Sequence, residues 1–181
     1  KVLFNATGAR AVETAWKASQ AFRPVKLLVL SPGFHGRSIA TASISDTPRC
    51  GPQLAAGAFT VEPSRYYPYC AQCPCGAVYP QCDVRCSTPL LERVAREAEG
   101  LSAVLVEPAV GARGYIFPPA EFFCRLADVA RQHGVLLIAD EIQTGLGRCG
   151  DWLCSRLQGW QPDLIVLGKS LGGGIVPISA V

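Results

Sequence analysis

The sequence lacks the features that would mark a membrane, secreted or nucleic-acid-binding protein. No run of about 18 apolar residues occurs, so we expect no membrane-spanning helix. The N-terminus has no charged lead followed by an apolar run and a cleavage site. We therefore expect no secretory signal and a cytoplasmic protein, or one of the mitochondrial matrix in a eukaryote. The 17 basic and 14 acidic residues are spread along the chain and give a formal net charge of only +3, which argues against nucleic acid as a partner.

Cysteine, by contrast, is abundant. Five of the nine cysteines fall in one short region: Cys70, Cys73, Cys75, Cys82 and Cys86. The odd total and the lack of a secretory signal argue against a disulfide scaffold. The spacing of these cysteines is compatible with a structural zinc site or an iron–sulfur cluster. We expect ordinary reduced loop cysteines and no metal, and keep a metal site as the alternative.

The order of the apolar segments predicts an α/β fold. Buried strands are expected at 26–30, 102–106, 135–140 and 164–167, and helices at 9–22, 90–99 and 119–133. This alternation predicts a mostly parallel sheet with helices on both faces. Residues 47–89 are rich in Pro, Gly, Tyr and Cys and show neither period, so we expect a long loop there. With 49% hydrophobic and 17% charged residues, the chain suits one domain with a sizeable core.

Two of the expected strands end on ionisable residues, and this pair says most about function. Asp140 ends one strand, and Lys169 follows the next strand along the chain, with enough residues between the two strands for one helical crossover. In a parallel sheet the carboxyl ends of strands border one crevice, where ligands bind. A carboxylate and an amine placed there suit pyridoxal phosphate, whose enzymes bind the cofactor through a lysine and pair its pyridinium nitrogen with an acid. Taken alone, Asp140 is more typical of a helix cap or turn residue, and Lys169 of a solvated lysine.

The residues around this pair carry a family resemblance. Asp140-Glu-Ile-Gln-Thr-Gly-Leu-Gly-Arg148 and Gly168-Lys-Ser-Leu-Gly-Gly-Gly174 resemble the signature of class III pyridoxal-phosphate aminotransferases. This group holds the ornithine, acetylornithine, 4-aminobutyrate and ω-amino acid enzymes. The resemblance covers residues 1–181 and implies the large, cofactor-binding domain of a fold type I pyridoxal-phosphate enzyme. Because family members are more than twice as long, we expect this chain to be part of that domain, without the small domain.

The resemblance also assigns roles to single residues. Lys169 would bind pyridoxal 5′-phosphate covalently and move a proton, and Asp140 would pair with the pyridine nitrogen. Gln143 would hydrogen-bond the 3-hydroxyl of the ring. Phe34, in an aromatic-His35-Gly-Arg segment, would stack on one face of the ring, and Ile142 would cover the other.

The first expected helix opens with Asn5-Ala-Thr7-Gly8-Ala9, and free backbone N–H groups at a helix N-terminus bind anions. The resemblance implies that Thr7, Gly8 and Ala9 hold the cofactor phosphate. Two positions depart from the family pattern, which usually has Glu at both: Arg10 and Ala112. Ala112 resembles the ω-amine and diamine branches, whereas the cysteine-rich region resembles the 4-aminobutyrate branch, so the amino donor stays open.

The resemblance implies an aminotransferase that moves an amino group from an amine or ω-amino acid, such as 4-aminobutyrate or ornithine, to a 2-oxo acid. The full-length enzyme would be a homodimer, and the 181-residue chain alone is expected to be inactive. An amino-acid racemase or aminomutase is the alternative within the same chemistry. The alternative from a different class of protein is a catalytically inactive domain that metal-bound cysteines stabilise.

Overall fold

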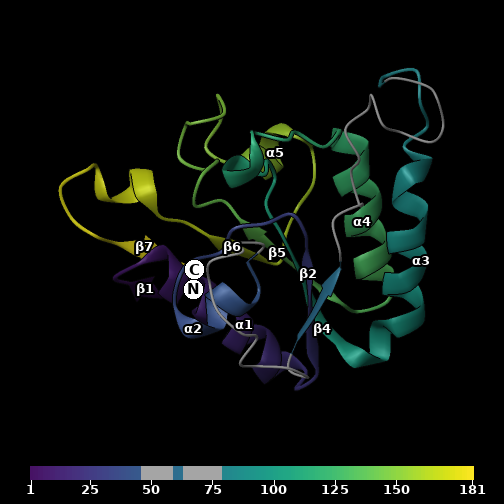
Figure 1. Cartoon of the computed structure of the whole chain (residues 1–181), viewed down its shortest axis with the longest axis horizontal. Helices are drawn as coiled ribbons and strands as arrows, with labels where there is room; N and C mark the ends of the chain where they lie inside the picture. The colour runs from purple at the N-terminus through teal and green to yellow at the C-terminus, as the bar shows by residue number, and fades with distance from the viewer. Residues whose placement is uncertain (46–58, 63–78) are drawn as a thin grey trace.

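A five-stranded, wholly parallel sheet forms the centre of the computed structural model, which describes residues 1–45, 59–62 and 79–181 (Figure 1). Its strand order is β3-β2-β4-β5-β6. The strands are β2 (Lys26–Leu30), β3 (Phe59–Glu62), β4 (Leu101–Val106), β5 (Leu136–Asp140) and β6 (Leu164–Val166). The expected α/β class and parallel sheet are confirmed.

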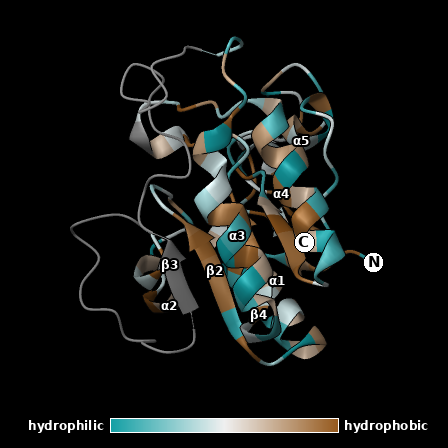
Figure 2. Cartoon of the chain, turned by 90° about the vertical axis from the view of Figure 1, so that its right-hand side faces the viewer, coloured by the Kyte–Doolittle hydropathy of each residue, from teal (hydrophilic) through white to brown (hydrophobic). Residues whose placement is uncertain are grey.

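Alternate residues of the strands bury opposite faces of the sheet against helices. On one face, α1 (Gly8–Phe22) packs through Ala11, Val12 and Ala15 against a cluster that includes Leu105 and Ile138. On the other face, α3 (Thr88–Glu97) and α4 (Ala120–Gln132) pack on the neighbouring strand residues Leu28, Val104, Leu137 and Ala139. Because successive strand residues point to opposite faces, a strand covered on both sides is apolar throughout. Figure 2 shows this for β2, which is hydrophobic except near its start at Lys26.

The two ends of the chain meet beside the sheet. Strand β1 (Phe4–Asn5) pairs antiparallel with β7 (Ser179–Ala180), so the termini lie next to each other in Figure 1. The Ser179 hydroxyl donates a hydrogen bond to the Thr7 carbonyl oxygen at 2.7 Å. This pairing fixes the start of α1 close to the segment that follows β6.

The remaining elements are short. They are α2 (Ile39–Ser43), α5 (Cys154–Leu157) and the 3₁₀ turns η2 (Arg85–Ser87), η3 (Ala98–Gly100), η4 (Gly111–Arg113) and η5 (Lys169–Gly172). Among the described residues, α1 with 15 residues is the longest helix, and none is long and apolar enough to cross a bilayer.

Two expectations about the connections were wrong in part. The segment 47–89 was expected to be a loop, yet it contains β3, which pairs in parallel with β2, and also η2 and the start of α3. A four-residue strand is too short to show a clear alternation of apolar and polar residues, and its pairing with β2 stabilises it. The crossover between β5 and β6 was expected to be helical, and its helix α5 is a single turn of four residues. The predicted elements β2, β4, β5, β6, α1, α3 and α4 begin and end within two residues of the expected positions, whereas β1, β7 and α2 were not predicted.

Candidate active site

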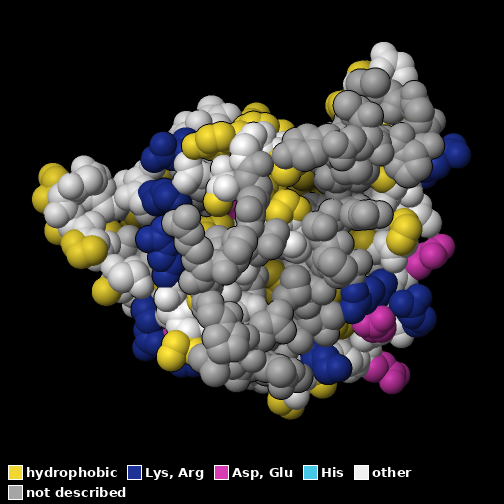
Figure 3. Space-filling model, in the orientation of Figure 1, with side chains coloured by type: hydrophobic (Ala, Val, Ile, Leu, Met, Phe, Trp, Pro, Cys, Tyr) yellow, Lys and Arg dark blue, Asp and Glu magenta, His cyan; other side chains and the backbone are white. Residues whose placement is uncertain are grey.

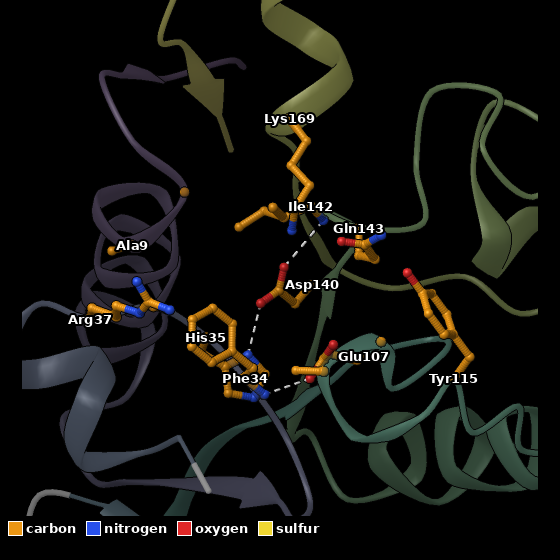
Figure 4. Close-up of a pocket in the computed structure, with 14 residues that line it drawn as sticks. Ala9, Phe34, His35, Arg37, Glu107, Tyr115, Asp140, Ile142, Gln143 and Lys169 are labelled. Carbon is orange, nitrogen blue, oxygen red and sulfur yellow. Dashed lines mark hydrogen bonds and ion pairs between the residues drawn. The ribbon is translucent and has the colours of Figure 1, made fainter. Parts of the chain in front are cut away.

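A pocket of about 600 Å³ lies at the carboxyl ends of the strands (Figure 4). The first turn of α1, the segments that follow β2, β4 and β6, and the end of β5 all border it. Eight of the nine residues that the sequence predicted for the site line this pocket: Gly8, Ala9, Phe34, His35, Asp140, Ile142, Gln143 and Lys169. The ninth, Thr7, is the N-cap of α1. The chemical roles of these residues stay predictions.

A buried ion pair forms the floor of the pocket. Asp140, the last residue of β5, is 3% exposed, and its Oδ2 lies 2.7 Å from Nδ1 of His35, which is 2% exposed. The other oxygen, Oδ1, accepts the backbone N–H of Ile142 at 3.2 Å. Burial alone would lower the pKa of His35, but the hydrogen bond and the negative charge of Asp140 outweigh it and raise that pKa. The pair therefore favours a protonated imidazole at His35.

A second carboxyl group, Glu107, lies at the same strand edge. It follows β4 directly, is 6% exposed, and its Oε1 accepts the backbone N–H of Phe34 at 2.7 Å. Burial raises the pKa of Glu107 to about 7, and the Asp140 charge acts in the same direction, while His35 and the N–H groups of Phe34 and Gly111 oppose it. The sequence analysis gave Glu107 no role. The signal was present, because Glu107 follows a buried strand as Asp140 ends one.

The N-terminus of α1 forms one end of the pocket. Thr7 caps the helix by accepting the backbone N–H of Arg10 at 3.3 Å, and the first-turn residues Gly8 and Ala9 line the pocket. Arg10, which departs from the family pattern, pairs with Glu13 at 2.6 Å, and Glu13 also accepts the hydroxyl of Ser38 at the start of α2. Arg10 therefore has an acidic partner within its own helix.

Glycines let the backbone approach closely around this helix end. At Gly36, with φ of +133°, a Cβ would lie 2.6 Å from Cβ of Ala9 and 2.6 Å from Oγ1 of Thr41. At Gly8, a Cβ would lie 2.8 Å from Cδ1 of Ile142, and at Gly168 it would lie 3.4 Å from Cγ1 of the same side chain. The segment after β2 and the Ile142 side chain can therefore approach the helix only because these positions carry no side chain.

Gly36→Ala is expected to destabilise the fold by roughly 2–5 kcal/mol, because it adds a steric clash to a backbone conformation that favours glycine. Urea unfolding of the full-length protein would measure this. Gly147→Ala is the matched control: its φ is +88°, but a Cβ there meets nothing within 4 Å. We expect a cost of roughly 1 kcal/mol for the control. Equal costs for the two variants would contradict the close packing at Gly36.

Lys169 enters the pocket from the segment after β6. It has a φ of +38°, which is uncommon for a residue with a side chain, and it starts the turn η5. Figure 4 shows its side chain extending toward Ile142 and Asp140. The next residue, Ser170, accepts a hydrogen bond from Arg148 at 3.0 Å, which ties η5 to the loop after β5. Lys169 is exposed, so a small molecule in the pocket can reach its amine.

The opposite wall consists of Gln143 and the turn after β4. A Cβ at Gly111 would lie 3.0 Å from Cγ of Gln143, so this turn packs directly on the glutamine. Ala112 and Tyr115 also line the pocket, and Figure 4 shows the Tyr115 ring on the same side as Gln143. Tyr115 has a φ of +57°, a strained conformation for an aromatic residue. The sequence analysis did not single out Tyr115, and no periodic pattern marks it.

The cysteine-rich segment is described only in part. Cys70, Cys73 and Cys75 lie outside the described residues. Cys82 and Cys86 are half-buried against the core cluster under α3 and α4. Within 1–45, 59–62 and 79–181, no three His, Cys, Asp or Glu side chains are grouped as metal ligands.

Comparison with known proteins agrees with this geometry. The sequence model of the family described as Aminotransferase class-III matches residues 1–181. An ornithine aminotransferase from an Exiguobacterium species is 34% identical over 187 residues, which are 97% of this chain and 40% of the relative. A leucine/methionine racemase from Thermococcus litoralis is 34% identical over 188 residues, 100% of this chain and 41% of the relative.

Solved structures show the same likeness. An amine transaminase from an uncultivated Pseudomonas species, in its pyridoxal-phosphate-bound form, has a TM-score of 0.84 and 34% identity, over 99% of this chain and 42% of that one. An ornithine aminotransferase from Toxoplasma gondii has a TM-score of 0.77 and 30% identity, over 99% and 40% of the two chains. The fold is that of a fold type I pyridoxal-phosphate enzyme. The chain belongs to the class III aminotransferase family, and it spans about two fifths of the length of these relatives.

Proposed function

We propose that this chain is the cofactor-binding part of a pyridoxal-phosphate-dependent aminotransferase. The full-length enzyme moves an amino group from an amine or ω-amino acid to a 2-oxo acid. The observation that supports this most directly is the convergence of Asp140, Lys169 and the N-terminus of α1 on one pocket. Each group suits one part of the same cofactor.

The residues present fit pyridoxal phosphate. The first turn of α1 offers backbone N–H groups and the positive end of the helix dipole, which suit a phosphate. Asp140 is a buried carboxylate whose orientation His35 fixes, and it suits a protonated ring nitrogen. Because residue 36 is a glycine, the segment after β2 can lie close to the N-terminus of α1. When bound, this cofactor supplies an electron-withdrawing ring that lets a proton leave the substrate carbon next to the amine.

The side chains of the chain then have separate tasks. Asp140 would keep the proton on the ring nitrogen, and the hydrogen bond to His35 holds the Asp140 carboxyl group in place. Lys169 would hold the cofactor through its amine, and the same amine, once free, would carry the proton to and from the reacting carbon. Phe34 and Ile142 would exclude water from the two faces of the ring. Gln143 would hydrogen-bond the ring hydroxyl.

A racemase is the second candidate, and the 34% identity to the leucine/methionine racemase favours it. Both reactions use an acid, a lysine and the same cofactor, and they differ in where the proton returns. Incubation of the full-length protein with an isotopically labelled amine and a 2-oxo acid would separate the two. We expect the label on the new amino acid. Inversion of the donor's configuration with no transfer of label would favour the racemase.

We further propose that the full-length protein is a homodimer of the cytoplasm. Five apolar side chains near the two ends of the chain are 55–88% exposed: Val2, Leu3, Phe4, Ile175 and Val176. Figure 3 shows hydrophobic side chains at the tip of the protrusion on the left of the view, where Figure 1 draws the C-terminal segment. Exposed apolar side chains of this kind are typical of surfaces that another protein chain covers. Sedimentation of the full-length protein would test the dimer.

A further inference from the structure

Glu107 has no task in the chemistry proposed above, yet it is one of the most enclosed polar groups of the pocket. Its carboxyl group accepts the N–H of Phe34 at 2.7 Å, and the backbone N–H of Gly111 acts to lower its pKa. Phe34 belongs to the segment after β2, and Gly111 starts η4 after β4. One carboxyl group therefore joins two segments that are far apart in the sequence. One of these segments carries both the aromatic ring and the histidine of the site.

Glu107 also lies close to the Asp140–His35 pair. A Cβ at Gly33 would lie 3.0 Å from Nε2 of His35 and 3.5 Å from Oε1 of Glu107, so both atoms border the same small space. Nε2 of His35 is buried and has no hydrogen-bond partner among the described residues. The proton state of Glu107 therefore acts on a ring whose other nitrogen already binds Asp140.

The charges around this carboxyl group are few. The ionisable or charged side chains that share the pocket with it are His35, Arg37, Tyr115, Asp140 and Lys169. Burial and the Asp140 charge raise the pKa of Glu107 to about 7, so its charge changes within the neutral range. The ionised form raises the pKa of His35 through its negative charge. When Glu107 is neutral, the negative charge of Asp140 alone raises the pKa of His35.

We propose that Glu107 is a positioning residue of this site. Its carboxyl group holds the Phe34–His35 segment on the strand edge, and its proton state tunes the charge that His35 and Asp140 present to the pocket. The tuning is a property of the chain itself, and its effect on catalysis rests on the proposed function.

Two variants of the full-length protein separate the two parts of this inference. Glu107→Gln keeps an oxygen that can accept the N–H of Phe34 but removes the charge. Glu107→Ala removes both. Glu99→Gln, an exposed position outside this pocket, is the matched control.

The first measurement needs no cofactor. The protein is labelled at the histidine rings, and the His35 signal is assigned by its loss in His35→Asn. Its pH titration is then followed by NMR. We expect a lower pKa for His35 in Glu107→Gln than in the wild type, because a neighbouring negative charge is lost, and no change in Glu99→Gln. An unchanged His35 titration in Glu107→Gln would overturn the tuning.

The second measurement is the binding of pyridoxal phosphate, followed by its absorbance. We expect Glu107→Gln to bind it nearly as tightly as the wild type and Glu107→Ala to bind it about tenfold more weakly, because the held segment loses its acceptor. Wild-type affinity in Glu107→Ala would overturn the positioning. If the wild type binds no pyridoxal phosphate, the proposed function fails and the positioning at a cofactor site fails with it. The His35 titration still decides the tuning.

Discussion

Lys169→Ala is expected to reduce amino transfer by the full-length protein by at least roughly 10²–10⁴-fold, the usual contribution of a positioned proton-transfer group. The loss of the covalent link to the cofactor adds to this. No other lysine lines the pocket among the described residues. Steady-state rates with an amine donor and a 2-oxo acid would measure the effect, and cofactor absorbance would show whether pyridoxal phosphate still binds.

The matched control is Lys17→Ala, which removes an exposed lysine of α1 outside the pocket. It should leave the rate unchanged. Hydride reduction of the wild type, which makes the link between lysine and cofactor irreversible, should label the peptide that contains Lys169. A label on Lys17 or Lys26, or a Lys169→Ala rate within about tenfold of the wild type, would contradict the assignment.

The sheet was predictable because its signals are local. Strands such as β4 and β5 are buried on both faces and appear as continuous apolar runs, while α4 shows helical spacing with a proline at its start. Asp140 and Lys169 were predictable for a related reason, because parallel strands deliver their ends to one edge. Strand β3 was missed because a strand of four residues depends on its pairing with β2, which the local sequence does not reveal.

The contacts within the site depend on long-range geometry. His35 and Asp140 are 105 residues apart in sequence. Only the packing of the segment after β2 on the end of β5 brings Nδ1 of His35 to 2.7 Å from Oδ2 of Asp140. Glu107, in contrast, has a local signal in the sequence. It directly follows the buried strand β4, as Asp140 ends the buried strand β5, so its place at the same edge of the sheet is predictable from the strand pattern.

Arg10 illustrates a compensation that a motif comparison does not reveal. Replacing the usual acid by a base at this position reverses a charge next to the helix end that we propose as the phosphate site. Glu13, one helical turn later, pairs with Arg10 and also accepts the Ser38 hydroxyl. A partner three residues away on a helix is predictable from spacing alone, but the link to Ser38 at the start of α2 requires the fold.

Asp140→Asn is expected to reduce turnover by roughly 10²–10³-fold, the usual effect of removing one preorganised electrostatic partner from an active site. The carboxylate is 3% exposed and lies at the pocket floor, so solvent does not replace its charge. Lys169 is untouched, and we therefore expect pyridoxal phosphate to stay bound. Asp128→Asn, on the exposed face of α4, is the control and should keep the wild-type rate.

The same variant should change how stability depends on pH. Asp140 raises the pKa of His35 above its ordinary value of 6.5, so the pair stabilises the folded state fully below pH 6.5 and loses this contribution as the pH rises through the higher folded pKa. Asp140→Asn should remove that dependence, and urea unfolding at pH values on both sides of 6.5 would measure it. If Asp140→Asn keeps a rate within about tenfold of the wild type, a barrier difference of only ~1.4 kcal/mol, the carboxylate does not hold the ring proton. If the rate falls but the pH dependence of stability persists, His35 takes its charge from another partner, and Glu107 is then the nearest candidate.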